Sequence, residues 1–270
     1  MRGIEIPAPV IDAVSTRWPD LASTWQETAP GELARICRRY KGRPVRTFDA
    51  RYGFVVEVET DHGYLVVRST PDPLGMMQAE VSQSLSDLGI GPQIYEVVQT
   101  SVSVWTVASR IFPGDSLHGR AISLDRLAPI FQRMRDQNSP SNQLPTLADW
   151  LHSRLSDENL SDLAPGRAQA PFDERRHAAA ILEDLESGAS NLLCHGDASS
   201  KNILLGPDGQ LFLIDPRGVS GDVCYDVAVA AWKTAGEEKP SARAAELARL
   251  VGVDTERVQA WLVVADTARV

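Results

Sequence analysis

The spacing of apolar residues changes twice along this chain, and these two changes constrain its fold more than any other feature. In the first 43 residues apolar side chains recur three and four positions apart, as at Leu33, Ile36 and Cys37, which predicts helix. After Pro44 the apolar segments become short and rich in Val, Phe and Tyr, which predicts strands. Beyond Phe112 the helical spacing returns. The sequence therefore predicts an α+β fold in which a β-rich part precedes a larger, mainly helical part.

The β-rich part is expected to be a five-stranded antiparallel sheet with one helix against it. The predicted strands are Val45–Asp49, Phe54–Thr60, Tyr64–Ser69, Ile94–Gln99 and Val102–Ser109, and the predicted helix carries Met77, Val81, Leu85 and Leu88. Phe112-Pro113-Gly114-Asp115 is typical of a linker. We expect residues 1–112 to form an N-terminal lobe, with 1–43 as a helical extension, and residues 113–270 to form the second lobe.

Composition excludes several classes of function. The chain has 270 residues, of which 43% are hydrophobic and 23% charged, as in globular proteins. Its net charge of −9, concentrated in the second half, argues against nucleic acid and favours a cationic small molecule. The three cysteines form no C-x-x-C pair, which indicates a reducing compartment, the cytoplasm. Apolar runs are far shorter than the roughly 18 residues of a membrane span, so no membrane partner is expected.

The segment from Leu192 to Gly218 carries the polar residues that indicate chemistry. Two short apolar strands, Ile203–Leu205 and Leu211–Ile214, are joined by a turn and predict a hairpin. Asp197 and Asn202 lie in the loop that enters this hairpin, and Asp215 follows its second strand. The three side chains should therefore meet at one end of the hairpin. Two carboxylates and a carboxamide supply the oxygen ligands that Mg²⁺ prefers.

The pattern His195-Gly196-Asp197-x-x-x-x-Asn202, followed by a hairpin and Asp215, resembles the aminoglycoside phosphotransferase family of the protein-kinase-like fold. The continuation Ile214-Asp215-Pro216-Arg217-Gly218-x-x-Gly221-Asp222-x-x-Tyr225-Asp226-x-Ala228 is similar to the branch that contains streptomycin 6-kinases and hydroxyurea-type phosphotransferases. This resemblance extends roughly from residue 44 to residue 265. It implies a two-lobed fold in which the β-rich lobe covers a nucleotide.

The resemblance also implies roles for individual residues in phosphoryl transfer. Asp197 would accept or orient the proton of a substrate hydroxyl, while Asn202 and Asp215 would hold Mg²⁺ across the phosphates of ATP or GTP. Arg68 stands at the strand position where the family has a phosphate-binding Lys, and Glu80 on the following helix would pair with it. His195 is expected to brace the loop by hydrogen bonds.

Further nucleotide contacts are expected from two loops. Arg51 and Gly53 lie where the family has its phosphate-covering loop, although this loop holds a single Gly. Ser109, Ile111 and Phe112 lie at the hinge between the lobes, whose backbone would meet the purine.

The expected reaction is phosphorylation of a hydroxyl on a small molecule, because too few residues separate Asp215 from Asp222 for the long activation segment of a protein kinase. Acidic residues such as Asp149 and Glu238 would attract a cationic antibiotic, either an aminoglycoside such as streptomycin or a basic cyclic peptide of the capreomycin or viomycin type, and phosphorylation would confer resistance. Alternatives are an amino-sugar or other small-metabolite kinase, a Mg²⁺-dependent phosphohydrolase, and a nucleotide-binding regulator without catalysis. A monomer is expected, with a homodimer left open.

Overall fold

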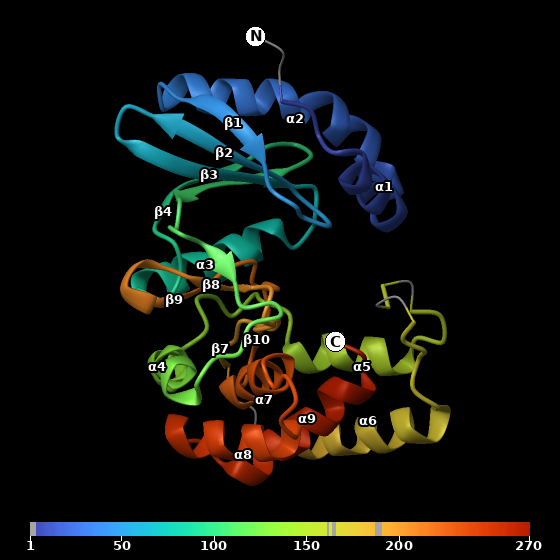
Figure 1. Ribbon diagram of the computed structural model, residues 1–270. Coiled ribbons are helices and arrows are strands. Elements are labelled where there is room, and N and C mark those ends of the chain that lie inside the picture. The colour runs from blue at the N-terminus through green and yellow to red at the C-terminus, as the bar shows by residue number, and fades with distance from the viewer. Residues whose placement is uncertain (1–3, 161, 164–165, 187–190) are drawn as a thin grey trace.

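The first half of the chain contains a five-stranded antiparallel sheet (Figure 1). The computed structural model describes residues 4–160, 162–163, 166–186 and 191–270. The strands are β1 (Arg43–Thr47), β2 (Phe54–Thr60), β3 (Gly63–Thr70), β4 (Ile94–Gln99) and β5 (Val104–Ser109), in the order β1-β2-β3-β5-β4. The predicted sheet is thus confirmed, although β1 begins and β5 begins two residues away from the expected positions.

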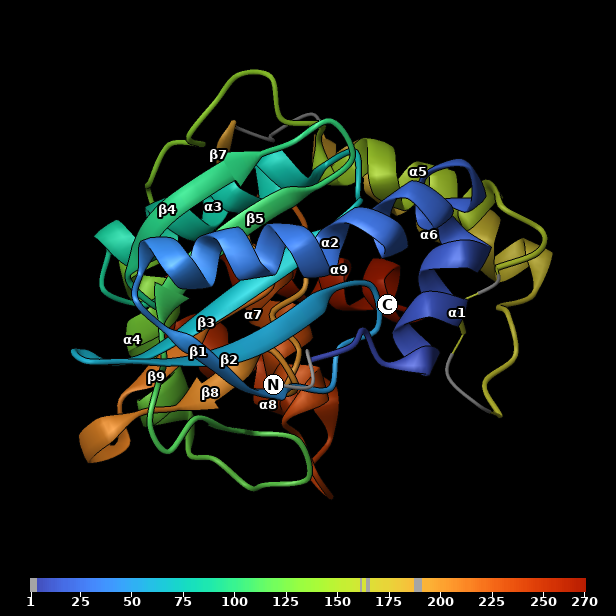
Figure 2. The ribbon, with the colours of Figure 1, turned by 90° about the horizontal axis from the view of Figure 1, so that it is seen from above.

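The two faces of this sheet have different partners because strand residues alternate between them. Val56, Val67 and Val107 point to one face and pack in a hydrophobic cluster with Trp25 and other residues of α1 (Ala8–Arg17) and α2 (Pro19–Arg39). Figure 2 shows α2 lying across the strands on this side. The opposite face therefore remains for the polar side chains of β2 and β3, and it is the face toward the rest of the molecule (Figure 1).

The helix α3 (Gly75–Asp87) lies against the sheet, as expected, and it also packs against the C-terminal part of the chain. It does contact β4 and β5, but its buried residues Val81 and Leu85 join the larger hydrophobic cluster of the C-terminal part. That cluster also contains residues of α4 (Leu124–Met134), α5 (Leu147–Ser156), α6 (Phe172–Glu186), α7 (Val223–Lys233), α8 (Pro240–Val251) and α9 (Thr255–Thr267). The helix therefore ties the sheet to the helical core.

Short strands hold the polar segment between the sheet and the helices. They are β6 (Asp115–Ser116), β7 (Leu192–Leu193), β8 (Ile203–Leu205), β9 (Leu211–Leu213) and β10 (Ser220–Gly221), and a 3-10 turn, η1 (Pro207–Gly209), joins β8 to β9. The β8–β9 hairpin is antiparallel, as predicted, and β7 pairs with β10. Figure 1 shows this layer directly below the sheet and α3. No helix among the described residues is long and apolar enough to cross a membrane.

Candidate active site

The predicted cluster of Asp197, Asn202 and Asp215 is held together by the β8–β9 hairpin. The Asn202 carboxamide Nδ2 donates to the Asp197 carbonyl oxygen at 3.0 Å. The Asn202 carbonyl oxygen in turn accepts from the Ile214 N–H at 2.9 Å, next to Asp215. The loop that enters the hairpin is thereby joined to the segment that leaves it, so the three polar residues lie at one end of a rigid element.

His195 braces this loop from the inside. Its ring is fully buried; Nδ1 accepts from the Asp197 N–H at 3.2 Å, and Nε2 lies 3.0 Å from the Ile214 carbonyl oxygen. Since Nδ1 accepts, the proton sits on Nε2 and is donated to Ile214. Burial lowers the pKa of His195 to about 4, so the ring is neutral and acts as a spacer between the two segments.

Asp226 fixes the same loop from below. It is fully buried on α7, and its carboxylate accepts from the backbone N–H groups of His195 (2.7 Å) and Gly196 (2.9 Å). Asp222, four residues earlier, caps α7 by accepting from Cys224 N at 2.8 Å and also accepts from the Trp261 indole at 2.8 Å. Both aspartates thus have structural roles.

Arg68 connects the sheet to the hairpin. Its Nη2 lies 2.8 Å from Asp215 Oδ1 and donates to Gln78 Oε1 at 3.1 Å. Among the described residues, Glu80 makes no ion pair with Arg68, which corrects the expected pairing. The physical reason is helix geometry: Glu80 lies two residues beyond Gln78, about 200° further around α3, and faces elsewhere.

The loop before β2 contributes Gly53 but places Arg51 elsewhere. Gly53 is buried against Arg68: a Cβ at this position would come within 3.1 Å of the Ser69 carbonyl oxygen and 3.6 Å of Arg68 Nε. Arg51 is exposed and donates to the Asp162 carbonyl oxygen at 3.3 Å. The structure therefore brings Gly53 next to the phosphate-binding candidate and gives Arg51 a different neighbour.

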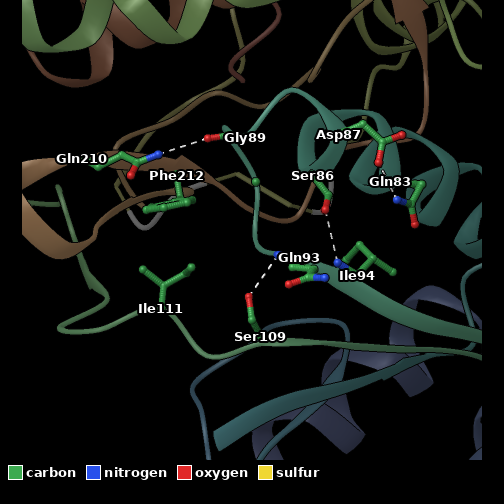
Figure 3. Close-up of a pocket in the computed structure, with 11 residues that line it drawn as sticks. Gln83, Ser86, Asp87, Gly89, Gln93, Ile94, Ser109, Ile111, Gln210 and Phe212 are labelled. Carbon is green, nitrogen blue, oxygen red and sulfur yellow. Dashed lines mark hydrogen bonds between the residues drawn. The ribbon is translucent and has the colours of Figure 1, made fainter. Parts of the chain in front are cut away.

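The expected hinge residues divide between two environments. Ser109 donates its N–H to the Gln93 carbonyl oxygen at 2.8 Å and accepts at Oγ from the Gln93 N–H at 3.0 Å (Figure 3). With Ile111 it lines a pocket of about 540 Å³ that also contains Phe212 and the end of α3, but none of the polar cluster residues or Arg68. Phe112 is instead 48% exposed and packs edge-on against Tyr64.

Arg217 is a site residue that the sequence analysis did not assign. Its guanidinium carbon lies 3.8 Å from the centroid of the Trp150 ring, its Nε donates to the Gly196 carbonyl oxygen at 3.1 Å, and its Nη2 lies 3.8 Å from Asp197 Oδ2. Burial raises the pKa of Asp197, and the Arg217 charge opposes this rise. The position two residues after Asp215 was a signal for Arg217, whereas Trp150 lies far away in sequence and gave none.

Charges of both signs lie beside Asp197, since Arg217 favours its ionised form and Asp215 opposes it. Burial, with the Arg167 charge, lowers the pKa of Lys233 to about 8, and Asp197 is close enough to act against this shift. The acidic residues expected to attract a polycation are engaged elsewhere: Asp149 bonds to Thr146 at 2.7 Å, and Glu238 pairs with Arg243 at 2.8 Å. Both of these acidic residues thus already have partners inside the protein.

Two oxygen atoms of the cluster are suited to a divalent cation. Because Asn202 uses Nδ2 for its hydrogen bond, its Oδ1 is available, and Asp215 Oδ2 is not used by Arg68. Within the described ranges no three His, Cys, Asp or Glu side chains are grouped as metal ligands. The pair fits Mg²⁺, which takes its other ligands from water and phosphate oxygens.

Comparison with known proteins agrees with this arrangement. The model of the APH family, described as the phosphotransferase enzyme family, matches residues 44–261. An aminoglycoside-3'-phosphotransferase of type VIII is similar in structure, with 19% identity, a TM-score of 0.58, and coverage of 87% of this chain and 97% of that chain. Choline kinase LicA from Streptococcus pneumoniae has 16% identity, a TM-score of 0.65, and coverage of 90% and 88%.

A third similar structure is spectinomycin phosphotransferase in complex with ADP and spectinomycin, with 11% identity, a TM-score of 0.61, and coverage of 88% of this chain and 85% of that chain. No curated protein sequence matches. The structural likenesses establish a protein-kinase-like fold, and the family model covers most of the chain. The chain belongs to the APH phosphotransferase enzyme family.

Proposed function

We propose that this protein transfers the γ-phosphoryl group of ATP or GTP to a hydroxyl of a small molecule. One observation carries the proposal: Asp197, Asn202 and Asp215 meet at the end of the hairpin. In the reaction a bond forms between the acceptor oxygen and the γ-phosphorus, the bond to the β–γ bridging oxygen breaks, and the nucleoside diphosphate leaves. We place the nucleotide under residues 1–112 and the acceptor on residues 113–270.

Asp197 would orient the acceptor hydroxyl and accept its proton, and Arg217 supports this role because its nearby charge favours the carboxylate form. Asn202 and Asp215 would hold Mg²⁺, which supplies countercharge to the phosphates when bound. Arg68 would grip a phosphate in place of the family's Lys, with the Gly53 backbone close above it.

At the hinge we propose that the base meets the free backbone groups of Arg110 (C=O) and Phe112 (N–H). No bond to either group is formed within the described residues, whereas the Ser109 N–H and the Ile111 carbonyl oxygen are already bonded inside the protein. The three cysteines are buried and unpaired, which supports the reducing cytoplasm as its compartment.

For the acceptor, we propose a cationic antibiotic: a streptomycin-type aminoglycoside first, because the motif resembles that branch, and a basic cyclic peptide second. The solved relatives that carry aminoglycoside, spectinomycin or choline in their names support a small acceptor with cationic groups. Because Arg217 and Lys233 lie near Asp197, the cationic groups of such an acceptor must sit away from the reacting hydroxyl. An amino sugar or another small metabolite is the alternative acceptor.

The test is incubation of the full chain with Mg²⁺, ATP or GTP and a panel of basic antibiotics and amino sugars, with phosphorylated product detected by mass. D197N should lower transfer by about 100-fold or more while nucleotide still raises the melting temperature. The control D208N makes the same chemical change at an exposed turn of the same hairpin and should retain activity.

Three outcomes would contradict the proposal. Full activity of D197N removes the proposed role of Asp197. No stabilisation by nucleotide, together with hydrolysis of phosphoesters, indicates a phosphohydrolase. Binding of nucleotide without transfer to any acceptor favours a non-catalytic regulator.

A further inference from the structure

A cluster of charged and aromatic side chains lies at the junction of the sheet and the linker that follows β5. The Arg110 guanidinium lies between two rings, 5.1 Å from the centroid of Phe48 and 4.9 Å from that of Phe112. Its Nε donates to Glu57 Oε1 at 2.9 Å, its Nη2 donates to the Pro113 carbonyl oxygen at 3.3 Å, and its Nη1 donates to the Ile111 carbonyl oxygen. A flat cationic group is thus held beside a carboxylate and between two aromatic rings.

The Arg110–Glu57 pair is buried. Its side chains are 8% and 7% exposed, whereas Arg46, which donates from Nε to the other Glu57 oxygen at 2.8 Å, is 56% exposed. Burial opposes ionisation of Glu57, but the hydrogen bonds and charges of the two arginines lower its pKa below the ordinary value. The carboxylate therefore accepts hydrogen bonds and donates none.

This cluster lies beside the phosphate-binding candidate on the same face of the sheet. Val55 pairs with Arg68, and Glu57, two residues further along β2, pairs with Val66. Two residues along a strand span about 7 Å, and they lead from Arg68 toward the linker. If the phosphates lie at Arg68 and Asp215, as in the proposed function on which this step rests, the base reaches the place that the Arg110 guanidinium occupies between Phe48 and Phe112.

The chemistry of this space favours one base. A base between two aromatic rings gains stacking energy whichever base it is. The edges differ: guanine presents two adjacent donors, N1–H and N2–H₂, beside the O6 acceptor, whereas adenine presents an acceptor at N1 beside the N6 donor. A buried carboxylate next to a guanidinium matches guanine, with Glu57 accepting from N1–H and N2–H₂ and Arg110 donating to O6. Against adenine, the carboxylate faces the N1 lone pair.

We propose that Arg110 and Glu57 recognise the base of the nucleotide and select guanine over adenine. To admit the base, the Arg110 side chain gives up its bonds to the Ile111 and Pro113 carbonyl oxygens and moves from between the rings to the base edge, while Arg46 keeps its bond to Glu57. The protein is then a phosphotransferase with GTP as its preferred donor.

The experiment measures the dissociation constants of the Mg²⁺ complexes of GTP and ATP for the full chain by calorimetry. GTP should bind about tenfold or more tightly than ATP, since a two-bond match of this kind discriminates roughly 5- to 150-fold. E57Q supplies an amide that both donates and accepts hydrogen bonds. It should therefore weaken GTP binding, leave ATP binding equal or tighter, and bring the ratio of the two affinities toward one.

The matched control is E59Q. Glu59 lies two residues beyond Glu57 on the same face of the sheet, is 32% exposed, and pairs with Arg43. The same chemical change there should leave the ratio of the GTP and ATP affinities unaltered. If E57Q does not fold, R110A serves instead: it removes the O6 donor and should also reduce the ratio. A general loss of protein stability would weaken the binding of both nucleotides equally and leave the ratio of their affinities unchanged.

Two results would overturn the inference: ATP binding at least as tightly as GTP to the unaltered chain, or a ratio that is the same in E57Q, R110A and E59Q. If ATP then supports phosphorylation of an acceptor, the proposed function stands and only the base preference is lost. If neither nucleotide binds, both are lost.

Discussion

Replacement of His195 by Asn should destabilise the protein in a way that depends on pH. The change removes the hydrogen bond from Nε2 to the Ile214 carbonyl oxygen and leaves that oxygen buried, while the shorter amide still offers an acceptor to the Asp197 N–H. An unmet buried acceptor costs about 1–3 kcal/mol. At pH 7.5, where the native ring is neutral, H195N should therefore be less stable than the native chain by about that amount.

Lowering the pH should cancel the difference in stability between H195N and the native chain. The pKa of His195 is lowered from 6.5 to about 4 in the folded chain, so between these values the unfolded chain binds the proton and the folded chain does not. Stability from this group is complete above pH 6.5 and is lost as pH falls toward 4. The 2.5-unit difference corresponds to about 3 kcal/mol, at 1.36 kcal/mol per unit. H195N has no titrating ring at this position, so its stability does not fall for this reason.

The assay is urea unfolding of both proteins at pH 7.5, 6, 5 and 4.3. The gap between the native chain and H195N should shrink through this series and close or reverse by the lowest pH. The control H62N changes an exposed histidine in the β2–β3 turn and should track the native chain at every pH. A gap for H195N that stays constant with pH would refute the claim that His195 is a buried neutral brace.

Three further predictions concern the loop and its charges. R217A should lower kcat about tenfold or more with little change in nucleotide affinity, and R217K should restore part of it, because the cation lies beside Asp197 and away from Arg68. R68A should abolish most of the rise in melting temperature that MgATP or MgGTP produces, and R68K should keep much of it. G196A should be destabilised by about 2 kcal/mol or more in chemical unfolding, because Gly196 has φ +76° and a Cβ there would lie 2.8 Å from Val219 Cγ2.

Predictions from the sequence were best for features formed by residues that are close together in the chain. Short segments rich in Val, Phe and Tyr located the sheet, and the hairpin located Asp197, Asn202 and Asp215 at one end of a single element, because both follow from residues that are close in sequence. The extent of the hinge contacts was predicted less well, since the partners of Ser109 lie on the preceding loop at Gln93.

Contacts between distant segments could not be predicted in this way. Nothing in the periodicity places Trp150 under Arg217, or Phe48 against Arg110, because each pair joins elements whose approach is set by the packing of the whole molecule. The family resemblance implied Glu80 as the partner of Arg68, whereas the helix phase, which depends on where α3 begins, brings Gln78 to Arg68 instead.

The choice of Gln78 explains how Arg can stand where the family has Lys. The Gln78 amide accepts from Arg68 through Oε1 and donates through Nε2 to Asp72 Oδ2 at 2.8 Å, so a neutral side chain links Arg68 to a carboxylate at the start of α3. The same helix turn lies close to the segment that follows the hairpin, because a Cβ at Gly218 would lie 2.7 Å from the Gln78 N atom. Arg68 is longer than Lys and presents several donors in one plane, so its Nη2 reaches both Gln78 and Asp215. In the proposed function its other nitrogens bind phosphate oxygens. The position of α3 therefore couples the orientation of Arg68 to that of Asp215 without a charged partner on the helix.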